Sequence, residues 1–347
     1  MNTDHFAILL AINHYPGLND LGGPLNDAAE FEKWLRSPAG GDVPQANIAT
    51  ILSAPSATAI DPYDALPQEV QFRKALDGFV RDLTKPERPW KQRAGQRLYI
   101  FMAGHGFTAG SAITDPALFS AVAQDGDPAH VSGYRYLAKL ANAGFFKELV
   151  LIMDCCQDVL KASQVLDPSW SPPDRNKSDS VSVFYAFGAP RGKKAFEREL
   201  GAEKKKHGLF TYTLIRALET AAADENGDVT GESLKKQLLQ LWGTSFRNET
   251  DYVPPVHTPD NCDIVFYRRT PSAAVPEAVV TFSPATGWPA NSTVEIYRNG
   301  SGQPYKQLPV NGNLSTPLPS GFFKAVLRGT PRSTLFEVLI DAKEVFL

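Results

Sequence analysis

The chain has 347 residues, of which 43% are hydrophobic and 21% are charged, and its formal net charge is −3 at pH 7. This composition is typical of a globular protein with a substantial core and room for two domains. The near-neutral charge gives no bulk attraction to nucleic acid, so we expect no nucleic-acid partner. The odd set of three cysteines, Cys155, Cys156 and Cys262, favours a reducing compartment over a disulfide framework.

The first predicted element is a short apolar run at residues 6–12, which we expect to be a core strand. No basic segment precedes it, no small-residue cleavage site follows it, and it is too short to span a bilayer. We therefore expect a cytoplasmic protein without a membrane partner. The six histidines are scattered, and no CxxC or HExxH spacing occurs, so we predict no metal site and no cofactor required for chemistry.

Helix and strand patterns alternate through the first two thirds of the chain. A Gly- and Pro-rich loop at residues 14–24 leads to a predicted helix at 26–36, with Asn26 or Asp27 placed to cap its start. This alternation predicts an α/β fold, with a mostly parallel sheet flanked by helices on both faces. The other predicted strands lie at 49–52, 97–106, 117–123, 147–156 and 181–187, and the other helices at 68–83, 133–143, 207–218 and 233–241.

The pattern changes near the C-terminus. Residues 166–180 are rich in Pro, Ser and charge, which predicts an exposed loop. Residues 1–268 form the predicted first domain, and residues 269–277 are predicted to be a linker. Residues 278–347 contain short β-rich runs between Gly, Pro and Asn turns, which indicates a small all-β sandwich domain.

Two of the apolar runs stop abruptly on a reactive side chain. One ends at His105, which lies between two glycines, and the other ends at Asp154, Cys155 and Cys156. Ligands bind beyond the carboxyl ends of parallel strands, so His105 and Cys156 are candidates for one site. Alternation along the strand gives Asp154 and Cys156 one direction and turns Cys155 into the core.

A cysteine beside a histidine can carry out nucleophilic acyl transfer. The imidazole takes the proton of a thiol, whose pKa is ordinarily about 8.5, and later protonates the leaving amine. The backbone N–H groups of Gly106 and Cys156 are candidates for the oxyanion hole. A cysteine at the end of a buried strand is also a common core residue, so the residues alone leave catalysis and a structural role open.

In chain order, a series of segments resembles motifs of the caspase-like cysteine peptidases, which include caspases, metacaspases and orthocaspases. The 51-residue separation of His105 and Cys156 is close to the spacing of roughly 50 residues in caspases. The resemblance covers about residues 5–266. It implies a caspase-haemoglobinase-like fold, with a large-subunit-like part at 1–165, the exposed loop, and a small-subunit-like part at 181–268. The matching segments are 7–16, 21–28 (LGGPLNDA), 102–106 (MAGHG), 154–156 (DCC), 183–186 with 195–197, and 207–212 (HGLFTY).

The resemblance also implies roles for single residues. Cys156 is the implied nucleophile and His105 its base, and Asp27 and Asp154 are implied to line a pocket that selects Arg or Lys at P1. Helix capping by Asp27 and a purely structural role for Asp154 remain alternatives. The strand at 183–187 is expected to pair with an extended substrate. Its implied substrate-binding residues are Tyr185 and Ala186.

Regulation is less well specified by the sequence. If the enzyme cleaves after basic residues, Lys161, Arg175 and Lys177 are candidate self-cleavage sites. The run Lys204-Lys205-Lys206 is a second candidate. Calcium is a regulator in metacaspases, but residues 224–228 lack the Gly and Glu that complete a calcium loop, so no calcium site is placed. The run Gln157-Asp158-Val159 replaces the usual His-Ser-Gly, and Asp158 adds a negative charge that opposes thiol ionisation.

We therefore predict a cytosolic caspase-like endopeptidase that cleaves proteins after Arg or Lys, activated by a regulatory signal or by self-cleavage. Residues 278–347 are predicted to recruit a partner protein. The alternative is a catalytically silent pseudo-peptidase that acts as a binding or scaffolding module, which the altered run after Cys156 motivates.

Overall fold

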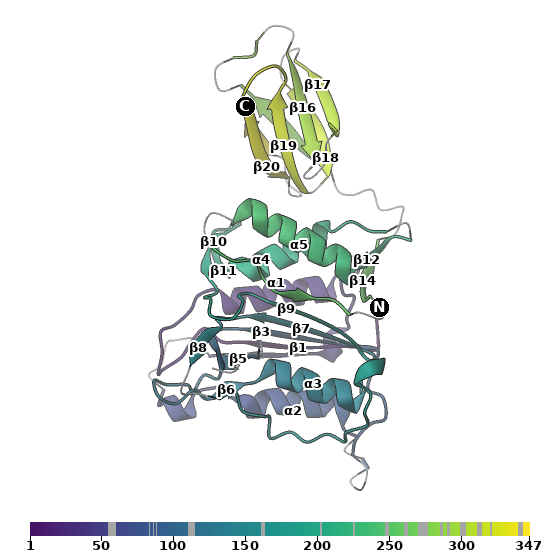
Figure 1. Ribbon diagram of the computed structural model, residues 1–347. Coiled ribbons are helices and arrows are strands. Elements are labelled where there is room, and N and C mark those ends of the chain that lie inside the picture. The colour runs from purple at the N-terminus through teal and green to yellow at the C-terminus, as the bar shows by residue number, and fades with distance from the viewer. Residues whose placement is uncertain are drawn as a thin grey trace. The chain divides into compact units, whose positions relative to one another are not determined.

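The computed structural model divides into two units, residues 1–268 and 269–347, which are described separately (Figure 1). It describes residues 1–54, 60–82, 84–85, 87, 89–109, 115–160, 164–201, 203–224, 226–246, 250–259, 263–269, 277–284, 287–289, 292–298, 303–310, 314–319, 321–338 and 343–347. Most of the predicted linker, residues 270–276, and Cys262 lie outside the described residues.

The first unit is built on a six-stranded sheet with the order β13-β9-β7-β3-β1-β2. All neighbours in it are parallel except β13, which runs antiparallel to β9. The residues of β3 are all buried, because helices cover both faces of the sheet and leave no side for polar side chains. The strands are β1 (His5–Ala11), β2 (Ile48–Leu52), β3 (Arg97–Ala103), β7 (Glu148–Asp154), β9 (Ser182–Phe187) and β13 (Val256–His257).

Figure 1 shows α1, α4 and α5 on one face of this sheet and α2 and α3 on the other. The helices on the second face supply apolar side chains such as Phe72, Leu76 and Tyr136 to a core shared with the strands. This arrangement is the α/β fold predicted from the sequence. The helices are α1 (Pro24–Arg36), α2 (Glu69–Val80), α3 (Gly133–Ala143), α4 (Leu209–Thr220) and α5 (Gly231–Ser245).

Smaller sheets extend the strands that carry the predicted site. A four-stranded sheet has the order β6-β5-β4-β8, and β10 and β11 form an antiparallel hairpin. Because β4 follows β3 and β8 follows β7, this second sheet continues the two central strands beyond their carboxyl ends. The strands are β4 (Gly106–Ala109), β5 (Pro116–Phe119), β6 (His130–Val131), β8 (Asp158–Leu160), β10 (Glu197–Leu200), β11 (Lys205–Gly208), β12 (Asp228–Thr230) and β14 (Val265–Arg268); the short 3-10 helices are η1 (Gln45–Asn47), η2 (Pro62–Asp64) and η3 (Ser178–Ser180).

Helix α1 begins two residues earlier than predicted. Pro24 occupies its first turn, where the missing N–H costs nothing, and the N-cap Gly23 has no side-chain capping bond. The side chain of Asn13 accepts the N–H of Leu25 instead, at 3.0 Å. The prediction that Asn26 or Asp27 caps this helix is therefore wrong. Other bounds also differ: α2 ends at Val80 rather than at residue 83, β5 ends at Phe119 rather than at 123, and the last two helices of this unit cover 209–220 and 231–245.

The segment 166–180 is exposed at most of its positions, as its composition predicted, but it is anchored to the domain. Trp170 is buried, and its indole N–H donates to Asp77 of α2 at 2.9 Å. The Lys139 ammonium group of α3 donates to the carbonyls of Pro168 and Trp170. These contacts bind the segment to α2 and α3. The anchor is a single tryptophan among Ser, Pro and charged residues, and the overall composition of the segment does not reveal it.

The second unit is a small sandwich of a three-stranded sheet, β18-β15-β21, and a four-stranded sheet, β17-β16-β19-β20. All strand pairs are antiparallel except β15 with β21. Its core includes Val280, Phe282, Ile296, Phe323 and Phe336. The strands are β15 (Glu277–Ser283), β16 (Thr293–Arg298), β17 (Lys306–Pro309), β18 (Leu314–Pro319), β19 (Gly321–Leu327), β20 (Ser333–Val338) and β21 (Lys343–Phe346).

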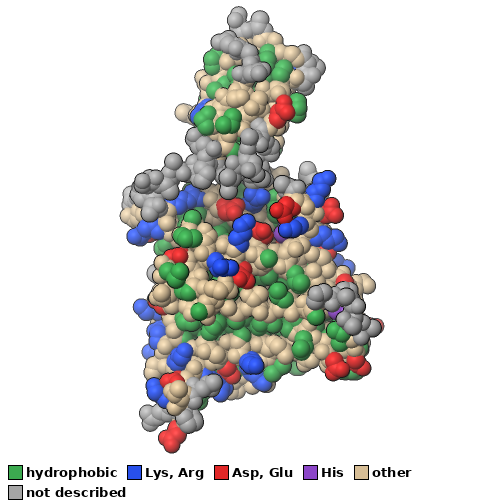
Figure 2. Space-filling view, turned by 180° about the vertical axis from the view of Figure 1, so that it is seen from behind, with side chains coloured by type: hydrophobic (Ala, Val, Ile, Leu, Met, Phe, Trp, Pro, Cys, Tyr) green, Lys and Arg blue, Asp and Glu red, His purple; other side chains and the backbone are tan. Residues whose placement is uncertain are grey.

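The surface of the first unit carries charges of both signs. Figure 2 shows Lys, Arg, Asp and Glu side chains spread over the face seen from behind, with hydrophobic side chains in a band at mid-height. Strand β2 forms one edge of the central sheet, where Leu52 is exposed.

Among the described residues, no helix combines the length and the hydropathy needed to cross a membrane.

Candidate active site

The strand register places His105 and Cys156 side by side. Before them, Ala103 of β3 pairs with Asp154 of β7, and after them, Phe107 of β4 pairs with Asp158 of β8. Both pairings have the same offset of 51 residues, so His105 and Cys156 occupy corresponding places in the short segments between these strands. Neighbouring strands lie about 4.8 Å apart, so the backbones of the two residues lie in one region of the domain.

The His105 side chain is held from the loop that follows β1. Its Nε2 lies 2.7 Å from the carbonyl oxygen of Asn19. A carbonyl only accepts, so Nε2 carries the proton and Nδ1 is left with a lone pair. Sequence reasoning missed this partner, because a backbone carbonyl leaves no mark in the residue type.

Cys156 is the accessible member of the cysteine pair. Cys155 is almost fully buried and belongs to the apolar core, whereas Cys156 is half-buried. Burial, together with the charges of Asp158 and Asp154, raises the pKa of the Cys156 thiol to about 11, against the bond to Ala195. The protonated thiol donates to the carbonyl of Ala195, with Sγ and the oxygen 3.7 Å apart.

A loop at residues 189–195 lies against the nucleophile strand. The N–H of Gln157 donates to the Lys193 carbonyl at 2.9 Å, and the Gln157 carbonyl accepts the N–H of Gly192 at 2.8 Å. The buried amide of Gln157 also donates to the Ala189 carbonyl. The departure from the usual family residue at position 157 thus has a structural role, because Gln157 fixes the loop that covers Cys156.

Gly106 sits at a point of close approach between strands. A Cβ at this position would lie 2.7 Å from the Sγ and Cβ of Cys155 and from the carbonyl oxygen of Ala117. Only a glycine fits there, which keeps the backbone beside His105 free of any side chain.

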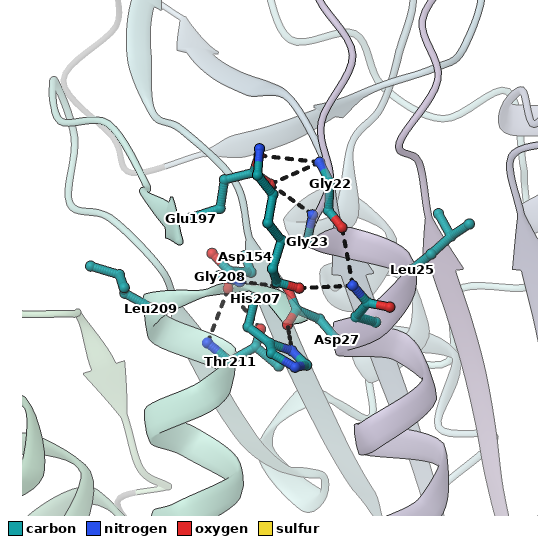
Figure 3. A network of polar contacts seen from close by, with 12 residues as sticks. Gly22, Gly23, Leu25, Asp27, Asp154, Glu197, His207, Gly208, Leu209 and Thr211 are labelled. Carbon is teal, nitrogen blue, oxygen red and sulfur yellow. Dashed lines mark hydrogen bonds and ion pairs between the residues drawn. The ribbon is translucent and has the colours of Figure 1, made fainter. Parts of the chain in front are cut away.

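Asp27 and Asp154 meet around Gly208, at the junction of β11 and α4 (Figure 3). Asp27 contacts the Nδ1 of His207 at 2.9 Å and accepts the N–H of Gly208 at 2.9 Å. Asp154 accepts both the N–H and the hydroxyl of Thr211. A Cβ at Gly208 would lie 3.1 Å from an oxygen of Asp27 and even closer to Oδ2 of Asp154.

Both aspartates have raised pKa values in this buried setting. Burial, together with the charge of Asp154, raises the pKa of Asp27 to about 7, while the bonds from His207 and Gly208 oppose the shift. Burial likewise raises the pKa of Asp154 to about 6, against the two bonds from Thr211. The charge of these carboxylates at neutral pH therefore depends on a cationic or hydrogen-bonding partner.

Glu197 is a third carboxylate at this place (Figure 3). It accepts the N–H groups of Gly22 and Gly23, the latter at 2.7 Å, directly before the N-terminus of α1. Its charge also contributes to the raised pKa of Asp154. The sequence offered a signal for this contact in the glycine pair before Pro24, because a helix N-terminus attracts anions.

A family model of the caspase domain, from the peptidase C14 family, matches residues 4–239. The chain belongs to the caspase-domain family. The resemblance and the fold predicted from the sequence are thereby confirmed.

Solved structures give a distant likeness to the same domain. The crystal structure of caspase-1 from Spodoptera frugiperda is similar with 13% identity and a TM-score of 0.46, over 78% of this chain and 92% of that chain. The structure of pro-sf-caspase-1 is similar with 14% identity and a TM-score of 0.40, over 74% and 92%. A comparison with curated protein sequences found no significant match.

Strand β9 of the caspase domain leaves no free edge at Tyr185 and Ala186. These residues pair with β7 on one side and with Val256 and His257 of β13 on the other. Ala186 is buried, and the Tyr185 ring stacks on His257. Backbone pairing of a substrate with these two residues, as the sequence suggested, is incompatible with this register. The backbone that contacts Cys156 belongs to residues 189–195 instead.

Two of the candidate self-cleavage residues, Arg175 and Lys177, lie in the described part of the chain, and both contact the domain. The guanidinium group of Arg175 donates to the carbonyls of Lys91, Gln92 and Ala143, so it is held against the domain. The Lys177 side chain is exposed, but its backbone N–H donates to the Asn142 carbonyl. Lys161 lies outside the described residues.

The described residues contain no group of three His, Cys, Asp or Glu side chains placed to hold a metal ion. In the calcium-loop-like segment, Asp224 accepts the N–H groups of Asn226 and Asp228. Asp228 pairs with both nitrogens of the Arg268 fork. Asp224 therefore stabilises a turn, and Asp228 forms an ion pair.

Proposed function

We propose that this protein is a cysteine endopeptidase that cleaves protein substrates after Arg or Lys, with Cys156 as nucleophile and His105 as base. The observation that supports the proposal is the shared 51-residue offset of the β3–β7 and β4–β8 pairings, because it gives His105 and Cys156 corresponding places after adjacent strands. The family membership supports hydrolysis of peptide bonds as the reaction.

The reaction starts when the Cys156 thiol turns from the Ala195 carbonyl to the imidazole. Nδ1 of His105 takes the thiol proton, since Nε2 is already protonated and donates to Asn19. The thiolate attacks the substrate carbonyl, and the N–H groups of Gly106 and Cys156 are proposed to hold the oxyanion. The imidazolium then protonates the leaving amine, and water hydrolyses the thioester to free the carboxylate product and the thiol.

The acidic groups around Gly208 supply the proposed preference for a basic P1 residue. Asp27, Asp154 and Glu197 bring three carboxylates to the start of α1 and α4. A guanidinium or ammonium group among them lowers the pKa values of Asp27 and Asp154 and restores the charge that burial suppresses on these two groups. An acidic P1 residue instead meets carboxylates of its own sign.

The test is hydrolysis of fluorogenic peptides with Arg, Lys, Asp or Ala at P1, in the presence and absence of calcium. We expect cleavage after Arg or Lys that is lost in Cys156→Ala and kept in Cys155→Ala, which removes the neighbouring buried thiol. Asp154→Asn should lower kcat/KM for the Arg peptide by about 10- to 100-fold. Cleavage after Asp would overturn the acidic pocket, and activity retained in Cys156→Ala would overturn the nucleophile.

A second candidate function is a silent pseudo-peptidase that binds a partner. The loop at 189–195 over Cys156, and the high pKa of its thiol, favour this reading. A thiol-reactive probe separates the two functions. A working dyad labels Cys156 selectively and loses that labelling in His105→Ala, whereas equal labelling of all three cysteines supports the scaffold. The cytoplasmic location, and recruitment of a partner by residues 278–347, remain predictions.

A further inference from the structure

The loop between β1 and α1 holds His105 at two points. The hydroxyl of Tyr15 accepts the backbone N–H of His105 at 2.9 Å, and the Asn19 carbonyl accepts Nε2–H of its ring. The Tyr15 ring also packs against the imidazole, with centroids 4.9 Å apart. Asp20 is the residue after Asn19, and its carboxylate accepts the N–H of Tyr15. It therefore links the two contacts.

The residues around the Tyr15 hydroxyl contact it closely. Tyr15 is almost fully buried, and its hydroxyl lies 3.5 Å from the Phe119 carbonyl, to which it donates. A Cβ at Gly104 would collide with this hydroxyl. Burial holds the phenol pKa far above its ordinary value, so the group stays neutral and can both donate and accept. A phenylalanine would fill the same apolar space without either bond.

We infer that Tyr15 is a positioning residue for His105, fixing the backbone and the ring plane of the imidazole that faces Cys156. This inference rests on the proposed function. Without the hydroxyl, the His105 N–H loses its partner and the strand end after Gly104 can shift, so Nδ1 no longer meets the thiol in one geometry. Misplacement of a catalytic group by about 1 Å can cost on the order of 100-fold in rate.

The experiment compares Tyr15→Phe with Tyr136→Phe. Tyr136 is a matched control, since it is also buried and its hydroxyl donates to Glu69 of α2, away from His105. For Tyr15→Phe we expect kcat to fall by about 10- to 100-fold with little change in KM. The pH midpoint of Cys156 alkylation should also rise by roughly 0.5–1 unit, because a loosely held imidazole stabilises the thiolate less. Loss of stability alone lowers the active fraction but leaves this midpoint in place.

A readout without catalysis keeps the inference separate from the proposed function. Ring ¹⁵N shifts report the tautomer of His105, identified by its absence in His105→Ala. We expect one Nε2-protonated form in the wild type and in Tyr136→Phe, and an averaged population in Tyr15→Phe. An unchanged tautomer and an unchanged alkylation midpoint in Tyr15→Phe would overturn the inference. A Tyr15-dependent tautomer in a wild type that cleaves no peptide would uphold the positioning role and sink the peptidase proposal.

Discussion

Asp154 accepts two hydrogen bonds from a single residue, Thr211, through its backbone N–H at 3.0 Å and through its hydroxyl at 2.7 Å. This contact joins the residue two before the nucleophile to the first turn of α4. It joins β7 to α4 beside the contact of Asp27 with Gly208. We therefore expect the same carboxylate to contribute to the stability of the domain and to the proposed recognition of a basic P1 residue.

Thr211→Val tests this contact, since valine keeps the shape and removes the hydroxyl. Loss of one hydrogen-bond donor to this buried carboxylate should lower the free energy of unfolding by about 1–3 kcal/mol. The measurement is urea denaturation at neutral pH. Thr213→Val is the control on the same helix, because its hydroxyl bonds only to the Leu209 carbonyl and its loss should cost less than about 1 kcal/mol. Equal losses in the two variants would count against a special role for the Asp154 contact.

Asp27→Asn should change how stability depends on pH. The pKa of Asp27 is about 7 in the folded protein against an ordinary value of 3.8, so between these values the folded state keeps a proton that the unfolded state has lost. The contribution of Asp27 to the free energy of unfolding is therefore fully present below pH 3.8. It is lost as the pH rises toward 7, at about 1.4 kcal/mol per pH unit. Asparagine cannot titrate and should remove this slope.

Urea denaturation at several pH values measures that slope. Asp64→Asn, which replaces an exposed carboxylate, should keep the wild-type behaviour. If Asp27→Asn and the wild type lose stability in parallel as the pH rises, Asp27 is ionised throughout and the burial argument fails.

The sequence predicted what depends on local pattern and missed what depends on contacts between distant segments. The apolar runs ending at His105 and Cys156 predicted two neighbouring parallel strands, because burial on both faces demands such runs. The partners of Asp27 could not be read in this way, since His207 and Gly208 lie about 180 residues further along the chain. A short polar side chain near the start of a helix is typical of a helix cap, so the local pattern around Asp27 predicted capping, which is not its role.

Gly208→Ala should damage the acidic pocket more than any helix glycine. Its methyl group would strike Oδ2 of Asp154, which Thr211 holds in place, so either the carboxylate or the start of α4 must move. We expect a loss of about 1–3 kcal/mol in the free energy of unfolding and a sharp loss of cleavage after Arg. Gly243→Ala in α5 is the control, because nothing lies within 4 Å of its Cβ, and it should gain roughly 0.5–1 kcal/mol. Comparable effects of the two substitutions would contradict the crowding at Gly208.

Glu197→Gln should weaken the contact between the β10–β11 hairpin and α1. A glutamine has one acceptor oxygen for the N–H groups of Gly22 and Gly23, and it lacks the charge that the helix N-terminus favours. We expect a loss of about 1–2 kcal/mol in guanidinium denaturation. The pKa of Asp154 should also fall, since Glu197 helps to raise it, and a ¹³C carboxyl titration measures this. Glu199→Gln on the exposed side of the hairpin should change neither quantity.

The structure also anchors the segment 166–180 in a way that the sequence did not predict, and this anchoring concerns regulation. Composition predicted an exposed loop open to proteolysis, but composition does not register one buried anchor or a guanidinium group bound to three carbonyls. The charged turn between β10 and β11 has no such anchor among its described residues, and Lys204, Lys205 and Lys206 are exposed. The structure thus favours the second candidate from the sequence, the run Lys204-Lys205-Lys206, over Arg175 as an accessible basic site.

Limited proteolysis with trypsin tests this difference in accessibility. We expect the first cut in the wild type after Lys204 or Lys205, with the bond after Arg175 cleaved later, because a protease needs local opening of its target. Arg175→Lys keeps a cleavable cation but cannot bind three carbonyls in a fork, so opening should become about 1–2 kcal/mol easier and cleavage at 175 about tenfold faster. Lys177→Arg, a swap on an exposed side chain, should leave the pattern unchanged. An early cut after Arg175 in the wild type would show that the segment is not bound to the domain in solution, and would return Arg175 to the candidates for self-cleavage.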